Sequence, residues 1–180
     1  MAAAAELIAE VGWGRVTTRA VAERAGLSHG AVSYHFRGKQ ELLTEAAMYA
    51  FAQAVPADEF AALAGVEDLI GLIAAEIGGH GATSPALTRL MFEAMREAER
   101  DAALRERMGA MLARYRELMV QAVRAEQERG AVFTGAPADA IATLLGAVGD
   151  GLLLHALLDP GLDVQPALDA LRALLAPRPS

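Results

Sequence analysis

Residues 16–43, VTTRAVAERAGLSHGAVSYHFRGKQELL, constrain the fold more than any other part of the chain. Thr17 or Thr18 can cap a first short helix, because a threonine hydroxyl accepts a hydrogen bond from a free amide of the first turn. Gly26 stands where that helix must end, and glycine takes the left-handed conformation there without steric cost. Since Ser28 can cap a second helix, the stretch predicts a helix-turn-helix followed by the start of a longer helix.

The second short helix, expected over residues 29–36, has two different faces. Val32 and Phe36 are four residues apart and therefore share an apolar face. The other side chains of this helix are mostly small or polar, which suits a helix that enters a DNA groove. We expect Leu27 to plug the turn between the two helices. A purely structural helix pair is the alternative interpretation.

Several features at fixed spacing make residues 20–43 resemble the DNA-binding motif of the TetR family of bacterial transcriptional repressors. They are the Ala-Gly-Leu-Ser turn, a glycine two residues later, the Tyr-His-Phe triplet, and a lysine followed by Leu-Leu. The resemblance implies an all-α fold with an N-terminal three-helix helix-turn-helix DNA-binding domain and a C-terminal helical ligand-binding and dimerisation domain. We expect these two domains over residues 1–51 and 52–180.

By resemblance, eight positions are expected to face operator DNA. Those expected at backbone phosphates, which position a protein without reading sequence, are Thr18, Tyr34, His35 and Lys39. Those expected at base edges are His29, Gly30 and Ser33, with Arg19 able to reach a guanine. Members of the family usually carry a longer, basic first helix, and this chain departs from that pattern before Gly12.

The charge distribution agrees with a localised DNA contact, although the whole chain has a formal net charge of −7. Residues 13–40 contain five basic residues and one acidic residue, a local charge of +4 that leaves −11 for the remainder. Phosphate attraction acts through the local basic face, and an acidic body can orient the molecule by repelling DNA from its other surfaces. The acidic residues could instead serve solubility alone.

Apolar residues recur at helical spacing along the rest of the chain, and only 5% of the residues are aromatic, which favours helices over sheets. A first helix carrying Leu7, Ile8 and Val11 should end at Gly12. Further helices are expected over residues 39–55, 66–77, 103–129, 137–158 and 164–175, and one begins at Pro85 after a capping Ser84. Residues 56–65 are expected to form a linker, and residues 78–81 a mobile loop.

Methionine and aromatic residues gather on the two middle helices of the tail. Methionine repacks easily, as a site for a variable ligand requires, but an ordinary core needs the same spacing. The resemblance implies a ligand cavity among these helices, with candidate effector-binding residues Phe92, Met95, Met108, Met111, Tyr115, Met119 and His155. Further polar candidates are His80, Arg89 and Arg96. Because this lining offers apolar area and few charges, we expect a small lipophilic or aromatic effector.

The helix from Pro137 to Leu158 is apolar on nearly all sides, and a helix without a polar face for the solvent needs packing partners on every side. Each of its glycines at 146, 149 and 151 lowers helix stability by roughly 1 kcal/mol relative to alanine. Close packing of another backbone at these positions would explain why glycine is present. We therefore expect a homodimer formed by this helix together with the one from Val164 to Leu175. A central helix buried within one chain is the alternative.

Other function classes find little support. The absence of cysteine excludes disulfides and thiolate sites, and the chain lacks the GxSxG, HExxH and glycine-rich phosphate-loop patterns. We expect no enzyme activity, no cofactor and no metal. The first eleven residues are apolar but have no basic leader and are too short to span a bilayer, so we expect no membrane partner.

The sequence therefore favours a cytoplasmic, nucleoid-associated regulator, more often a repressor in this family, that binds palindromic operator DNA and responds to a ligand. One alternative is a DNA-binding protein without an effector. A second is a helical carrier or enzyme that has lost DNA binding.

Overall fold

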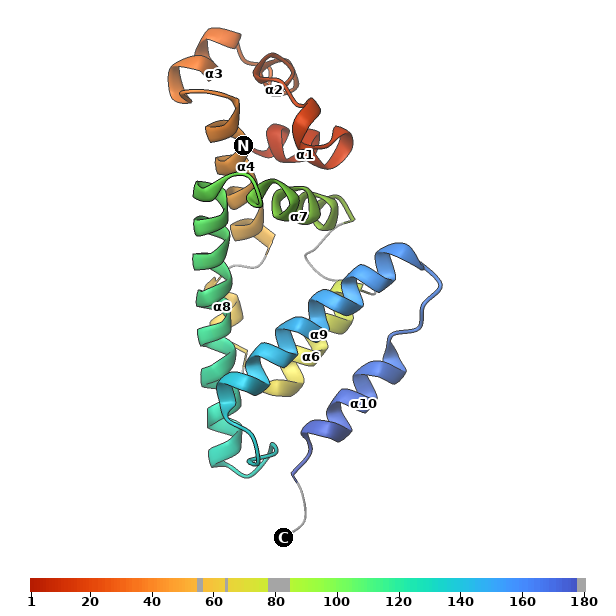
Figure 1. Cartoon of the computed structure of the whole chain (residues 1–180). Coiled ribbons are helices and arrows are strands. Elements are labelled where there is room, and N and C mark those ends of the chain that lie inside the picture. The colour runs from red at the N-terminus through yellow and green to blue at the C-terminus, as the bar shows by residue number, and fades with distance from the viewer. Residues whose placement is uncertain (55–56, 64, 78–84, 178–180) are drawn as a thin grey trace. The chain divides into compact units, whose positions relative to one another are not determined.

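The computed structural model describes residues 1–54, 57–63, 65–77 and 85–177, and the regular elements in these residues are helical (Figure 1). In chain order they are α1 (Ala2–Val11), the 3-10 helix η1 (Trp13–Arg15), α2 (Thr18–Arg24), α3 (His29–His35), α4 (Lys39–Ala54), α5 (Ala57–Ala61), α6 (Val66–Ile77), α7 (Pro85–Ala98), α8 (Ala102–Glu128), α9 (Ala138–Leu158) and α10 (Gln165–Leu175). The prediction of an all-α fold is confirmed.

Local side-chain caps define the helix-turn-helix. The Thr17 hydroxyl accepts a hydrogen bond from the Ala20 amide at 3.1 Å and starts α2. Gly26 has φ +66°, the left-handed conformation that ends the helix without a steric penalty. The Ser28 hydroxyl then accepts a hydrogen bond from the Ala31 amide at 3.2 Å and starts α3. Of the two threonines considered from the sequence, Thr17 is the cap.

The turn between α2 and α3 differs from expectation in one respect. Leu27 is 56% exposed and does not plug the turn. The backbone closes the turn instead, because the Leu27 amide donates to the Ala22 carbonyl at 2.9 Å. Val32 is the buried residue of α3, and Phe36 is half-buried just beyond the end of that helix, in an extended conformation.

The first compact unit comprises Met1–Pro56 and Thr83–Ala110. Its core forms where α1 packs against both α4 and α7. Small side chains at the crossings, such as Ala4, Ala46 and Ala94, are fully buried and allow the helices to approach closely. Trp13 of η1 is only 1% exposed and completes this core.

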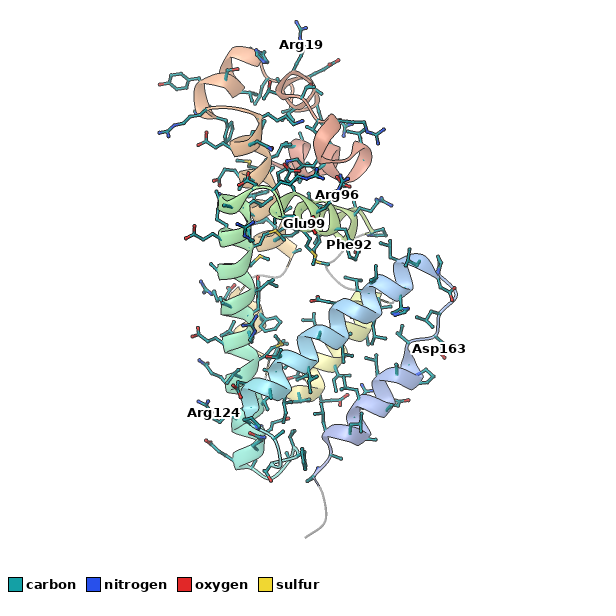
Figure 2. The ribbon with its side chains drawn as sticks, in the orientation of Figure 1. Arg19, Phe92, Arg96, Glu99, Arg124 and Asp163 are labelled. Atoms are coloured by element: carbon teal, nitrogen blue, oxygen red, sulfur yellow. The ribbon has the colours of Figure 1, made fainter. Side chains whose placement is uncertain are left out.

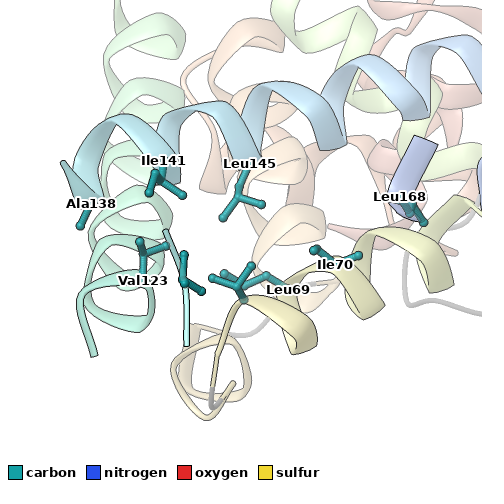
Figure 3. Packing of buried hydrophobic residues seen from close by; sticks show 9 residues of the cluster. Leu69, Ile70, Val123, Ala138, Ile141, Leu145 and Leu168 are labelled. Atoms are coloured by element: carbon teal, nitrogen blue, oxygen red, sulfur yellow. The ribbon is translucent and has the colours of Figure 1, made fainter. Parts of the chain in front are cut away.

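The second unit comprises Ala57–Ala82 and Met111–Ser180. Figure 3 shows its core, in which side chains of α6 and α9 meet with contributions from α8 and α10. The buried residues labelled there are Leu69, Ile70, Val123, Ala138, Ile141, Leu145 and Leu168. This cluster lies on only one side of α9.

Two of the three glycines of α9 have neighbours within the chain. A Cβ at Gly149 would lie 3.3 Å from the Ile73 side chain, and one at Gly146 would lie 3.6 Å from the Met119 methyl group. These glycines therefore let α6 and α8 approach α9. Gly151 has no neighbour within 4 Å of such a Cβ.

The two units differ from the expected domains 1–51 and 52–180, because α7 and the first part of α8 pack with the N-terminal helices. The expected linker at 56–65 also contains the short helix α5, since Phe60 and Leu63 pack against the second core. The expected loop at 78–81 with His80, and the Ser84 cap, lie outside the described residues.

Candidate nucleic-acid interface and ligand pocket

Helix α3 presents a polar, accessible face. His29, Ser33, Tyr34 and His35 are all exposed, and the Tyr34 side chain is 86% exposed with its ring at the edge of the His35 ring. Gly30 lies on the same helix, and a Cβ there would meet only the Ser28 hydroxyl, at 3.9 Å. A helix with this face and no bulk at its first turn can approach a groove closely.

A side-chain hydrogen bond links the starts of α2 and α3. Thr18 Oγ1 lies 3.2 Å from His29 Nε2, and the tautomer of the ring decides which atom donates. One ring nitrogen is therefore held by α2, while His29 Nδ1 is left to contact another group. The arrangement fixes the imidazole at the position where base contacts were expected.

The five basic residues within residues 13–40 fall into two groups. In three of them the side chain is already engaged within the protein. Arg24 donates to both carboxylate oxygens of Glu10 at 2.9 and 2.8 Å, and these bonds hold the pKa of Glu10 below its usual value. Lys39 Nζ donates to the Gly14 carbonyl at 2.7 Å, and Arg15 Nε donates to the Val11 carbonyl at 2.5 Å.

Arg19 and Arg37 form the second group. Both are exposed, and neither guanidinium has a hydrogen bond or ion pair to another residue that the structure describes. Figure 2 shows Arg19 extending outward from α2. Sequence reasoning counted the Arg37 charge but did not place it at the interface. Its position between α3 and α4, directly after the last turn of α3, is the signal that identifies it.

The residues predicted to bind an effector are divided between the two units. Phe92, Met95 and Met108 belong to the first unit, where Met108 is buried, Phe92 is half-buried and Met95 is exposed. Arg96 also lies there and pairs with Glu93 at 2.8 Å, and Arg89 is exposed on the same helix. Figure 2 labels Phe92 and Arg96 on α7.

The second unit contains a pocket of about 400 Å³ between α5, α6, α8 and α9. Tyr115 and Met119 line it, whereas Met111 and His155 do not. Lining residues that sequence reasoning did not propose include Phe60, Leu72, Ile73, Leu112, Asp150 and Leu153. Helical spacing marked the apolar faces, but it could not show which of them leave a cavity between them.

The pocket contains an aromatic pair and two charged residues. The rings of Phe60 and Tyr115 meet edge to face, with centroids 5.1 Å apart and planes at 71°. Asp150 comes from α9 and Arg116 from α8, and the two form no ion pair. Burial raises the pKa of Tyr115, and it also raises the pKa of Asp150.

A second surface of this unit is apolar and open. The exposed leucines on α9 and α10 include Leu144, Leu154, Leu157, Leu158 and Leu174. By length and composition alone α9 could also cross a membrane, the one described helix that passes this test. Its Asp139 and Asp150, and the burial of Ile141 and Leu145 against α6, fit a helix of a folded domain better.

Comparison with known proteins gives two family matches. Residues 1–46 match the model for bacterial regulatory proteins of the tetR family. Residues 66–177 match the model for the C-terminal part of BetI-type transcriptional repressors. None of the curated proteins matches the chain significantly.

Solved structures share this architecture over nearly the whole chain. A Saccharomonospora viridis protein assigned as a transcriptional regulator, in complex with choline, is 25% identical with a TM-score of 0.77, covering 98% of this chain and 95% of that one. SmeT in complex with triclosan is 26% identical with a TM-score of 0.72, covering 97% and 88%. NalD of Pseudomonas aeruginosa, a repressor of a multidrug efflux pump, is 23% identical with a TM-score of 0.75 over 97% and 93%, which shows the common fold.

Proposed function

The chain belongs to the TetR family of bacterial transcriptional regulators, and from this premise we propose that it represses transcription by binding a palindromic operator as a homodimer, from which a small, mostly apolar effector releases it. The match to BetI-type repressors supports repression over activation. A DNA-binding regulator of this family works in the cytoplasm, and we propose that this one is associated with the nucleoid.

DNA binding is supported by the exposed face of α3 and by two arginines, Arg19 and Arg37, that form no ion pair with any described residue. Arg19 and Arg37 can each neutralise a phosphate without first breaking a contact within the protein. Lys39 Nζ already donates to the Gly14 carbonyl. To contact a phosphate it must break that hydrogen bond or donate through its other ammonium protons. We propose that His29 and Ser33 read bases while these cations position the helix.

The pocket of the second unit supports a small-molecule effector. Its volume is within the range of ligand sites, and most of its lining is apolar. Two relatives of 25% and 26% identity were solved with choline and with triclosan, both small organic molecules. We propose that the effector binds beside Tyr115 and Met119. The other residues proposed from the sequence do not line this pocket, so we expect them to affect effector binding only indirectly. They are Phe92, Met95, Met108, Met111 and His155.

The exposed leucines of α9 and α10 support the dimer. Leu144 and Leu158 are 62% and 76% exposed, and burying a leucine side chain is worth about 1.5–3 kcal/mol. A twofold axis along α9 and α10 would pair these surfaces and present two copies of α3 to successive major grooves.

We propose that release is an equilibrium between two dimer conformations that differ in the separation of the two α3 helices. Helix α8 connects the pocket covalently to the DNA-binding part of the chain. Its residues Leu112, Tyr115, Arg116 and Met119 line the pocket, and Arg107, nearer its start, pairs with Glu45 of α4. Operator DNA must then weaken effector binding by the same factor by which the effector weakens DNA binding.

The test is a selection of bound sites from random DNA, followed by a screen of small molecules for release of the best site. A DNA-binding protein without an effector would retain its site whatever compound is added. A helical carrier or enzyme that has lost DNA binding would select no site at all.

A pair of variants connects release to the pocket. Ala147 lines it, so Ala147→Trp should fill it and leave a protein that binds the operator but no longer responds to the effector. Ala140→Trp, at an exposed position of α9 outside the lining, is the matched control and should respond normally.

A further inference from the structure

We infer that Thr18 sets the tautomer of the His29 ring on DNA, so that the free ring nitrogen is an acceptor and His29 selects a base with an amino group, adenine or cytosine. This inference rests on the proposed function, in which His29 reads a base of the operator. It goes further because it states which bases His29 selects and makes Thr18 the positioning residue for that selection.

The first step is the hydrogen bond between the two side chains. Thr18 Oγ1, at the start of α2, lies 3.2 Å from His29 Nε2, at the start of α3. A neutral imidazole has one N–H and one acceptor nitrogen, whereas a hydroxyl has one proton and two lone pairs. If the hydroxyl donates to Nε2, then Nδ1 carries the ring proton and is a donor. If Nε2 donates to the hydroxyl, then Nδ1 is an acceptor. The acceptor to which the Thr18 proton goes therefore decides what Nδ1 offers to a base.

The second step is the acceptor that DNA brings to Thr18. The next residue, Arg19, is exposed and extends outward from α2 (Figure 2), so its guanidinium attracts a phosphate to this end of the helix. The Thr18 hydroxyl is available there, because Thr17 rather than Thr18 caps α2. A hydrogen bond to an ionised phosphate is roughly twice as strong as one between neutral groups. The phosphate therefore takes the Thr18 proton, and the Thr18 oxygen accepts from His29 Nε2–H.

The third step is the group that Nδ1 can then meet. In this tautomer Nδ1 is an acceptor, and it forms no hydrogen bond with any residue that the structure describes. His29 is exposed, and its neighbour Gly30 has no side chain that would keep a base away from the start of α3. In the major groove adenine N6 and cytosine N4 are donors, whereas guanine and thymine offer acceptors only. An acceptor nitrogen at His29 therefore favours adenine or cytosine and meets a lone pair on guanine.

Guanine is the base that the opposite arrangement would favour. With the hydroxyl donating to Nε2, the Nδ1–H group would donate to guanine N7 or O6. A protonated ring would also donate to guanine, because both of its nitrogens then carry a proton. Measurements at about pH 8, where an exposed imidazole is neutral, remove this second case.

Base analogues that lack a single functional group test the inference. The base pair that His29 reads is the one at which substitution changes the affinity of the wild type but not that of His29→Ala. At this pair, fluorescence anisotropy at about pH 8 would compare the natural bases with three analogues. Purine is adenine without its amino group, pyrimidin-2-one is cytosine without its amino group, and 7-deazaguanine lacks the N7 acceptor. Any effect of an analogue on the duplex itself appears equally in His29→Ala.

Two substitutions of Thr18 separate its hydroxyl from its shape. Thr18→Val has the same shape without the hydroxyl, and it leaves the Thr17 cap of α2 in place. Thr18→Ser keeps the hydroxyl and is the matched control. A residue that only held a phosphate would weaken binding to all operators equally when it is replaced. The ratio between operators is therefore the measurement that reports the tautomer.

The wild type and Thr18→Ser should prefer adenine or cytosine over guanine at this pair by about tenfold, and removal of the amino group should cost about as much. Thr18→Val should reduce the preference to about twofold or less. Unchanged ratios in Thr18→Val, or a guanine preference that 7-deazaguanine abolishes, would overturn the inference while operator binding stands. So would an equal loss of affinity for every operator in His29→Ala. A chain that selects no DNA site would instead overturn the proposed function, and this inference with it.

Discussion

The backbone amide of Trp13 donates a hydrogen bond to the Glu93 carboxylate at 2.8 Å, although the two residues are 80 positions apart. The Trp13 indole donates to Gln40 at 2.9 Å, and the Gln40 amide donates in turn to Glu97 at 2.8 Å. Two carboxylates of α7 therefore hold η1 and the start of α4. Since α4 begins beside α3, this network connects α7 to the helices that position the DNA reader.

We expect Glu93→Ala to lower the free energy of unfolding by roughly 1–3 kcal/mol, because the partly buried Trp13 amide loses a charged acceptor. Glu93→Gln retains an acceptor and should cost less. Urea unfolding measures both. Glu99→Ala, at an exposed position of the same region that Figure 2 labels, should change stability by no more than about 0.5 kcal/mol. A loss as large as that of Glu93→Ala would show that the network is not the cause.

Sequence reasoning succeeded where the structure is set by neighbours along the chain. Thr17, Gly26 and Ser28 act within four residues of their own positions, and such short-range rules locate α2 and α3 well. The bond between Trp13 and Glu93 obeys no such rule. A glutamate that stays in solvent and a glutamate that accepts from a distant amide cannot be distinguished in the sequence, so this contact could not be predicted.

The same limit explains the pocket. Apolar periodicity identified Tyr115 and Met119, but it grouped them with Phe92 and Met95, whose helix packs in the first unit. The sequence did not predict that Asp150 lines a pocket, because the residues next to it in the chain do not show what surrounds it in the fold. Only the folded arrangement shows that α5, α6 and α8 face it across a cavity.

The salt dependence of DNA binding should distinguish free from engaged arginines. Arg37→Ala should lower the slope of log affinity against log salt concentration by about one, since an unpaired cation at the end of α3 displaces a counterion from a phosphate. Arg24→Ala should change the slope much less, because Glu10 already neutralises that charge. Fluorescence anisotropy over a range of salt concentrations gives both slopes. Equal reductions would mean that the Glu10 pair opens on DNA.

Base recognition should depend on His29. His29→Ala is expected to change the preference for one operator position by roughly 1–3 kcal/mol, because the ring is held at the start of α3 by Thr18. Thr18→Val should weaken the same preference, since the hydroxyl that orients the ring is lost. Affinities for a set of single-substitution operators provide the measurement. A uniform loss across all operators in His29→Ala would place the histidine on the phosphate backbone instead.

Dimer formation should depend on the leucines that α9 leaves exposed. Leu154 and Leu158 are one turn apart, 41% and 76% exposed, and neither lines the pocket, so glutamates there should leave the protomer folded. In a dimer the same glutamates would lie in an apolar contact against their own copies, where desolvation and like-charge repulsion act together. The variant with Leu154→Glu and Leu158→Glu should therefore sediment as a monomer, with native helical content and little affinity for a palindromic site. Ala113→Glu, at an exposed position of α8, should remain dimeric. Wild-type protein that sediments as a monomer at micromolar concentration, yet binds the palindrome tightly and without cooperativity, would contradict the proposed interface.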